Sequence, residues 1–136
     1  MRAESRGAAA AGMIGDSVFG RWRMLLLIGF FLAVALAGTF FAIHLLRGHK
    51  LPLPVGLLHG LGALAAIALL VLHDLHAPTN RLVNSATVFF VLTAIGGMLL
   101  FVLRARRQPL DGIIVTLHAG FALTAMLLLT LGYLSG

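Results

Sequence analysis

Hydrophobic residues gather in four long runs, at residues 24–46, 54–72, 82–103 and 112–134, separated by short polar connections. A helix rises 1.5 Å per residue, so roughly 20 apolar residues cross the ~30 Å hydrocarbon core of a bilayer. Each run is long enough to do so. The pattern predicts an all-α integral membrane four-helix bundle. Short connections force an up-down-up-down order, with both chain termini on one side.

The connections carry the expected helix-boundary residues. Pro54 suits the first turn of the second helix, because its missing N–H would have no partner there. Asp111, just after Pro109, is the expected N-cap of the fourth helix. Between the second and third helices, "HDLHAPTNR" contains Pro78 and Asn80, which predict a turn.

Composition supports a membrane protein. The 136 residues are 60% hydrophobic and 10% charged, against about 25% charged in soluble domains. The absence of cysteine excludes disulfides, thiolate metal sites and thiol catalysis. The net charge of +6 lies mostly at helix ends, where basic residues anchor membrane proteins, so we discount a nucleic-acid partner.

The first 23 residues differ from the apolar domain, residues 24–136. They lack a compact apolar core and a clear cleavage site, so we expect a mobile or interface-lying tail rather than a cleaved signal peptide. Trp22 and Arg23 are expected at the membrane surface.

The sequence also contains an internal repeat. With an offset of 59 residues and no gap, residues 30–72 align with 89–131, and 14 of the 43 positions are identical. The rarer matches carry the weight: Phe30 and Phe31 with Phe89 and Phe90, Gly38 with Gly97, Arg47 with Arg106, and His59 with His118. We infer a tandem repeat of a two-helix hairpin, with repeats of about 24–74 and 82–134. Equivalent residues should lie at one depth on helices that run in the same direction.

His59 and His118 are therefore predicted to be level, each about five or six residues inside its helix. Ionisable groups within a membrane cost free energy unless they are paired or bind something. Two level imidazoles can be the axial ligands of one haem iron. Alternatively, each can make a structural hydrogen bond across the bundle, worth only ~1 kcal/mol.

Small residues near the histidines fit either role. Ala63 and Ala66 follow His59 on its helix face, as Ala122 and Ala125 follow His118, and these stripes predict either a slot for a flat ring or close helix packing. Gly38 and Gly97, expected about a turn deeper, remove side chains where a ring or backbone must come close. Gly96 marks either a kink or a packing contact.

The densest basic cluster of the chain lies at the membrane surface nearest these histidines. Its members are Arg47, His49, Lys50, Arg104, Arg106 and Arg107. These residues can bind the propionates of a haem, or they can serve only to orient the protein in the membrane. His44 lies close in depth to His59 and is a candidate propionate partner or replacement ligand. Its repeat equivalent is Leu103, so it ranks below the level pair.

The pattern resembles the four-helix membrane b-type cytochromes over residues 24–134. The resemblance implies His59 and His118 as haem ligands, with Gly38 and Gly97 as the clearance pair. Two-haem members of that class carry a second ligand further along each of the same helices. Here His73 lies 14 residues after His59, but Gly132 occupies the equivalent position, which favours one haem. His76, Tyr133 or a ligand from outside the repeat would have to substitute for a second.

His73, Asp74 and His76 cluster at the opposite surface. We prefer a solvated helix end there over a metal site or a quinone pocket.

Three functions follow. The first is a membrane electron-transfer module, a subunit rather than a stand-alone enzyme, which binds one bis-histidine haem b and passes electrons between quinol and a partner protein. Quinone is its second candidate cofactor. The alternative is a non-catalytic accessory subunit of a larger bacterial membrane complex. Transport ranks last, because we expect no buried carboxylate to line a path.

Location and partners are predicted more coarsely. Arginine, alanine, leucine and glycine dominate and there is a single lysine, which suggests a high-GC bacterium and its inner membrane. Basic residues favour loops one and three on the cytoplasmic side. Phenylalanine-rich faces of the first and third helices suit other membrane subunits, a homodimer or lipid.

Overall fold

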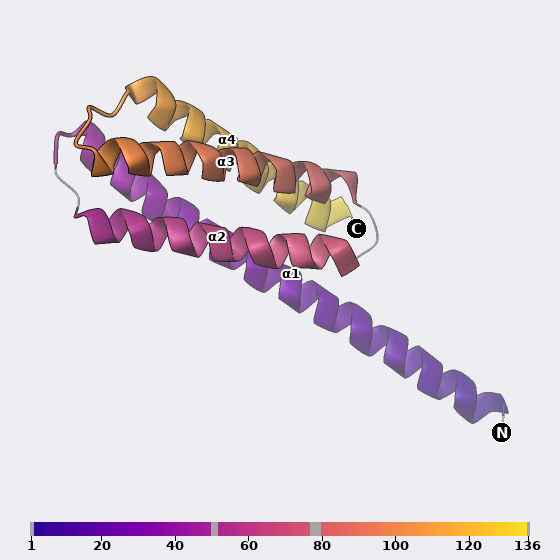
Figure 1. Cartoon of the computed structure of the whole chain (residues 1–136). Helices are drawn as coiled ribbons and strands as arrows, with labels where there is room; N and C mark the ends of the chain where they lie inside the picture. The colour runs from indigo at the N-terminus through magenta and orange to yellow at the C-terminus, as the bar shows by residue number, and fades with distance from the viewer. Residues whose placement is uncertain (1, 50–51, 77–79, 136) are drawn as a thin grey trace.

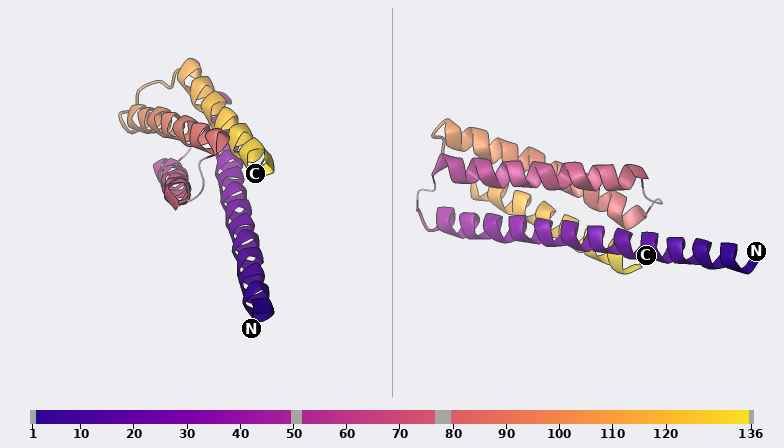
Figure 2. Two further views of the ribbon diagram at one scale, coloured as in Figure 1. Left: turned by 90° about the vertical axis from the view of Figure 1, so that its right-hand side faces the viewer. Right: turned by 90° about the horizontal axis from the view of Figure 1, so that it is seen from below.

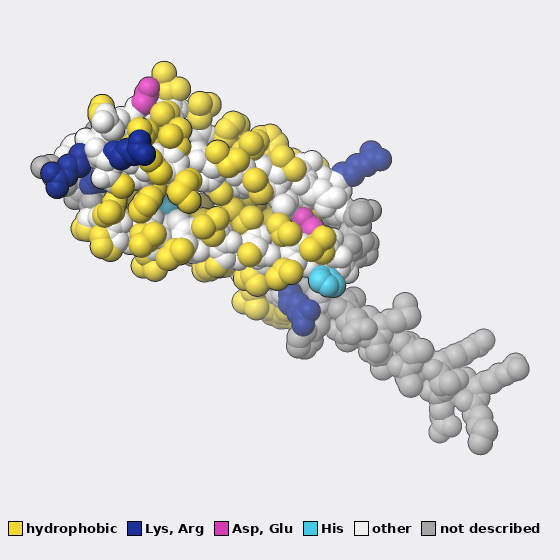
Figure 3. Space-filling model, viewed as in Figure 1, with side chains coloured by type: hydrophobic (Ala, Val, Ile, Leu, Met, Phe, Trp, Pro, Cys, Tyr) yellow, Lys and Arg dark blue, Asp and Glu magenta, His cyan; other side chains and the backbone are white. Residues whose placement is uncertain are grey.

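A computed structural model describes residues 2–49, 52–76 and 80–135 and contains four helices (Figure 1). They are α1 (Arg2–Leu46), α2 (Leu53–His76), α3 (Arg81–Ala105) and α4 (Gly112–Ser135). Within these ranges no residue forms a strand, so the predicted all-α class is confirmed. All four helices are long and apolar enough to cross a membrane. Apolar side chains cover most of the face seen in Figure 3. The chain is a multi-pass membrane protein.

Helix α1 is much longer than its membrane span. The helix begins at Arg2, whereas the candidate span covers Gly20–Leu45. The segment expected as a mobile or interfacial tail, residues 2–23, is thus continuous with the first crossing and projects beyond the other helices (Figure 1). That it lies at the membrane interface stays a prediction.

The helices form a closed ring of neighbours. Helix α1 packs against α2 and α4, and α3 also packs against α2 and α4, whereas α1 faces α3, and α2 faces α4, across the diagonals. The closest packing is between α3 and α4. Figure 2 shows that both termini lie at one end of the bundle and the α1–α2 and α3–α4 connections at the other. This is the predicted up-down-up-down order.

Local chemistry sets the helix ends. Pro54 lies in the first turn of α2 as predicted. Asp111 caps α4, since its Oδ1 accepts a hydrogen bond of 2.8 Å from the N–H of Ile113. The side-chain oxygen of Asn80 caps α3 by accepting from the N–H groups of Leu82 and Val83. The predicted turn residue Pro78 lies outside the described residues.

Helices α1 and α3 end in the same backbone motif. At the end of α1, Gly48 adopts a φ of +78° and the N–H of His49 donates to the carbonyl of His44 over 3.0 Å. At the end of α3, Arg107 adopts a φ of +56° and the N–H of Gln108 donates to the carbonyl of Leu103 over 2.9 Å. Both ends are Schellman motifs. Every position in one matches the other at the offset of 59, so the repeat extends to the hydrogen bonds.

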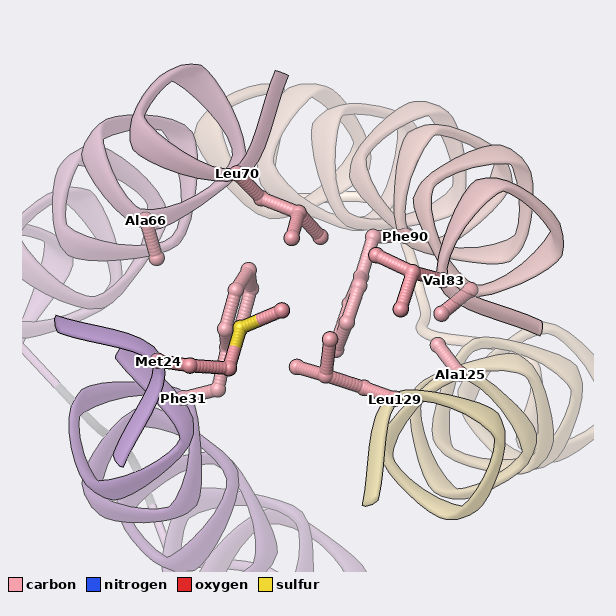
Figure 4. Close-up of a cluster of buried hydrophobic side chains, with 9 residues drawn as sticks. Met24, Phe31, Ala66, Leu70, Val83, Phe90, Ala125 and Leu129 are labelled. Atoms are coloured by element: carbon pink, nitrogen blue, oxygen red, sulfur yellow. The ribbon is translucent and has the colours of Figure 1, made fainter. Parts of the chain in front are cut away.

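The core is built from repeat-equivalent pairs. Among the residues whose side chains the structure describes, nine hydrophobic side chains are buried, and eight of them pair at the same offset: Met24 with Val83, Phe31 with Phe90, Ala66 with Ala125, and Leu70 with Leu129. The remaining member is Ala86. Figure 4 shows these side chains pointing toward one another from all four helices. Across the α1–α3 diagonal, the rings of Phe31 and Phe90 stack with their centroids 4.0 Å apart.

This core fills only one end of the bundle. We call residues 20–31, 66–76, 80–90 and 125–135 the packed half, and residues 32–65 and 91–124 the histidine half. Every buried side chain lies in the packed half, and among the described residues of the histidine half none is fully buried. The stacked Phe31 and Phe90 lie at the boundary between the two halves.

Candidate functional site

The two predicted ligands occupy matching positions on diagonal helices. His59 is the seventh residue of α2 and His118 the seventh of α4. Both helices start at the same end of the bundle and run in the same direction, so the two residues lie the same number of positions from that end. Both side chains are half-buried.

A glycine of the neighbouring helix lies against each ring. A Cβ atom built on Gly38 of α1 would come within 2.8 Å of His59 Cε1, and one built on Gly97 of α3 would come within 3.0 Å of His118 Cε1. Real Cβ contacts are essentially never shorter than 3.0 Å. The glycines are therefore in direct contact with the imidazoles. Each leaves the space that its histidine ring occupies.

The two rings differ in their hydrogen bonds. Nδ1 of His118 lies 2.9 Å from the backbone oxygen of Thr93 on α3. A carbonyl oxygen only accepts, so Nδ1 carries the hydrogen, and neutral His118 keeps its lone pair on Nε2. Nδ1 of His59 is buried without a hydrogen-bond partner. Its nearest aromatic neighbour is Phe41, edge-on with 5.7 Å between centroids.

The alanine stripes fall into two pairs. Ala66 and Ala125 are completely buried in the hydrophobic core, where close packing accounts for their small size. Ala63 and Ala122, one helical turn nearer the histidines, are only half-buried. Close packing therefore accounts for Ala66 and Ala125, and a slot at Ala63 and Ala122 stays a prediction.

Basic residues stand at the histidine end of the bundle (Figure 3). Arg47 and Arg106 occupy equivalent positions at the ends of α1 and α3, and both are exposed. Lys50 lies outside the described residues. His44 does not adjoin His59 through any ring contact; its ring packs between Phe40, at 4.7 Å, and His49, at 4.9 Å. A role for His44 toward a propionate stays a prediction.

Gly132 lies where a second haem would need a histidine ligand, and close contacts between α3 and α4 fill the space around it. A Cβ atom on Gly132 would lie 2.7 Å from Val83 Cγ2 and 3.2 Å from the Val83 nitrogen. The Asn80 amide also donates to the carbonyl of Gly132 over 2.9 Å. No imidazole fits there, which gives a physical reason for the missing histidine in the second repeat. Tyr133 packs against the hydrophobic core instead.

The cluster of His73, Asp74 and His76 does not converge on one point. His73 and His76 line a cleft of about 630 Å³ between α1 and α2, and Nδ1 of His76 donates to the carbonyl of Leu72. Asp74 instead accepts a 2.6 Å hydrogen bond from Thr87 on α3. In the described part of the chain, no three potential metal-ligating side chains come together.

Sequence reasoning missed two interhelical bonds, Thr87 to Asp74 and Asn80 to Gly132. It expected no carboxylate inside the bundle, yet Asp74 is half-buried between α2 and α3. The signal for the second bond was present in part, because Asn80 precedes an apolar run as an N-cap would. The bond from Asn80 to Gly132 could not be predicted from the neighbouring sequence, because the two residues are 52 positions apart.

His59, His118 and the residues around them can be compared with the requirements of a haem site. A bis-histidine haem needs two level imidazoles on facing helices, and His59 and His118 meet that condition. It also needs a polar atom with an unmet requirement or a cradle without side chains. The unpartnered Nδ1 of His59 is such an atom, and Gly38 and Gly97 leave room for the imidazole rings themselves. The residues therefore fit the group.

Comparisons with protein-family models, with curated proteins and with solved structures find no match for this chain.

Proposed function

We propose that this protein is a membrane electron-transfer module that binds one haem b through His59 and His118 and passes electrons between quinol and a partner protein. One observation carries the proposal. The imidazoles of His59 and His118 lie at equivalent positions on diagonal membrane helices, and each ring contacts a glycine of the neighbouring helix. A methyl group at either glycine would push the ring out of its place.

A purely structural role explains one histidine but not the other. The bond from His118 to Thr93 is what a histidine that only braces two helices would make. His59 makes no such bond, and its buried Nδ1 costs about 1–3 kcal/mol while it is unpaired. A bracing role alone leaves this nitrogen of His59 without a partner. This difference favours the module over the accessory subunit.

The chain's own residues would do four things. His59 and His118 would bind iron, and the Thr93 carbonyl would hold His118 in the tautomer that presents Nε2. The apolar bundle would exclude water. Arg47 and Arg106 would stand near the propionates. Haem, when bound, supplies one-electron redox chemistry, and two imidazole ligands leave no open position for oxygen.

The setting of the module is part of the proposal. A bacterial inner membrane with loops one and three in the cytoplasm agrees with the arginines at the ends of α1 and α3. Gly132 at the position equivalent to His73 supports one haem rather than two. Partner subunits or a second copy would supply the electron acceptor.

The test is an absorbance spectrum. The full chain is produced with ample haem, purified in detergent and reduced with dithionite. We expect a red protein with a sharp alpha band, one haem per chain, and loss of that low-spin band in both His59→Ala and His118→Ala. His76→Ala, an exposed histidine at the other end, is the matched control and should keep the spectrum. A colourless wild-type protein would remove the proposal and leave the accessory role.

A further inference from the structure

We propose that the two imidazoles are unequal: His118 is the permanent ligand and His59 the exchangeable one, so that carbon monoxide can take the place of His59 on the reduced iron. This inference rests on the proposed function. Its basis is a set of contacts that one repeat makes and the other lacks.

His118 is held by the backbone of α3. Besides the 2.9 Å bond from Nδ1 to the Thr93 oxygen, the ring lies against Gly97 and its Cβ atom lies 3.6 Å from the Cβ position of Gly96. An outer hydrogen bond of this kind fixes ring orientation, raises ligand basicity and is typically worth 10–100-fold in metal affinity. Rotating His118 away from iron would break it.

His59 has only van der Waals and ring-edge contacts. Gly38 and Phe41 touch the ring, and Nδ1 finds no acceptor. The repeat equivalent of Thr93 is Val34, whose backbone oxygen makes no bond to His59 among the described contacts. Moving away from iron would therefore cost His59 no hydrogen bond.

The sequence explains why the two hairpins differ. Helices α3 and α4 pack more closely than α1 and α2. Gly132 allows this, since its missing side chain brings α4 against Val83 at the start of α3. The equivalent residue on α2 is His73, whose side chain lines the cleft between α1 and α2. In the less closely packed first hairpin, Nδ1 of His59 makes no hydrogen bond.

The exchange is a ligand substitution without electron transfer. The bond from the His59 nitrogen to iron breaks, a bond from the carbon of carbon monoxide to iron forms, and His118 stays in place. Neutral diatomic ligands of ferrous iron are the class expected at this position. Their approach would be from the interior around Ala63, on the side of His59.

The test compares the two single variants in the haem-loaded full chain. We expect His59→Ala to retain haem as a five-coordinate, high-spin species that binds carbon monoxide at once and regains a low-spin spectrum with added imidazole. His118→Ala should hold haem at least about 10-fold more weakly. The dithionite-reduced wild type should bind carbon monoxide slowly, at a rate set by departure of His59. Thermal unfolding of each variant shows that both remain folded.

A second measurement does not depend on haem. Ring-nitrogen NMR of the ¹⁵N-histidine apoprotein should show one fixed tautomer for His118, with hydrogen on Nδ1, and exchange between tautomers for His59. A red wild type in which both variants lose haem equally, or in which only His118→Ala accepts carbon monoxide, would overturn the inference and leave the proposed function standing. A colourless wild type would instead remove the proposed function.

Discussion

The two halves of the bundle are built from the same four helices but differ in how they use small residues. In the packed half, Gly132 and the completely buried Ala66 and Ala125 bring helices together around Leu70 and Leu129. In the histidine half, Gly38 and Gly97 make room for imidazole rings, and no described side chain is fully buried. The packed half contains the buried core, whereas the described side chains of the histidine half form no buried core.

This division predicts separable effects. Lipid is as apolar as a leucine side chain, so helix association in a membrane depends on close packing and interhelical hydrogen bonds. Substitutions in the packed half should therefore lower stability and leave the histidines in place. Substitutions around the histidines should change ligand binding at small cost in stability.

The largest effect is expected at Gly132. Gly132→Leu would push a side chain into Val83 and the α3 backbone, and we expect it to cost at least about 3 kcal/mol or to abolish the folded bundle. Gly120→Leu is the control, since a Cβ atom on Gly120 of the same helix meets nothing within 4 Å. Unfolding in mixed detergent, followed by circular dichroism, measures both. Equal stability of the two variants would contradict the packing at α3 and α4.

The core leucines come next. Leu129 is fully buried, and Leu129→Ala should cost about 2–5 kcal/mol, as cavity-forming changes do. Leu131→Ala, at a position 44% exposed, should change stability by less than about 0.5 kcal/mol. The alpha band of the haem-loaded protein should survive in both at low temperature. A lost band with unchanged stability would show that the halves are not separable.

The histidine half is probed through its glycines. Gly38→Ala and Gly97→Ala place a methyl group where the imidazole ring stands, so each should weaken haem binding, Gly97→Ala by about 10-fold or more and Gly38→Ala by less, while lowering stability by only about 1–3 kcal/mol. Haem titration of the apoprotein measures the affinity. Gly60→Ala, which meets nothing within 4 Å, is the matched control. Unchanged affinity in both variants would count against the ring positions.

A smaller effect is expected at Asn80. Its side chain caps α3 and ties it to Gly132, so Asn80→Ala should cost about 0.5–2 kcal/mol of unfolding free energy. The exposed Asn84→Ala should be nearly neutral. Haem affinity should be the same in both, because Asn80 lies in the packed half. If Asn84→Ala were as costly as Asn80→Ala, the capping bonds would not be the cause.

The smallest effect tests the repeat itself. Arg107 holds a left-handed conformation that in the first repeat belongs to Gly48. Arg107→Gly should therefore raise the unfolding free energy by about 1 kcal/mol, and Gly48→Ala should lower it by a similar amount. Opposite signs in the same denaturation assay are the expected result. Two changes of the same sign would contradict the equivalence of the two helix ends.

Much of the fold was predictable because it depends on patterns that the sequence displays directly. Run length predicted the four helices, and the offset of 59 residues predicted that His59 and His118 would be level. The offset also predicts the pairing of core residues, although only the structure shows that Phe31 stacks on Phe90. Repeats are informative because equivalent positions must meet equivalent neighbours.

Side-chain contacts between distant helices were not predictable. The direct contact of Gly38 and Gly97 with the imidazole rings was not predictable in detail, because the reach of a ring across a helix contact depends on the distance between the helices. The half-buried Asp74 was missed for a similar reason, since its position near a helix end favours exposure until Thr87 is placed beside it. The asymmetry of His59 and His118 lies in tertiary packing alone.

The central claim is that one chain supplies two imidazoles to one iron. Pulsed electron paramagnetic resonance of the oxidised, haem-loaded protein with ¹⁵N-labelled histidine tests it most directly. The account predicts a low-spin ferric centre with two coordinated histidine nitrogens in the wild type and one in His59→Ala. A centre without coupled histidine nitrogen, or the same two nitrogens in both His59→Ala and His118→Ala, would contradict it.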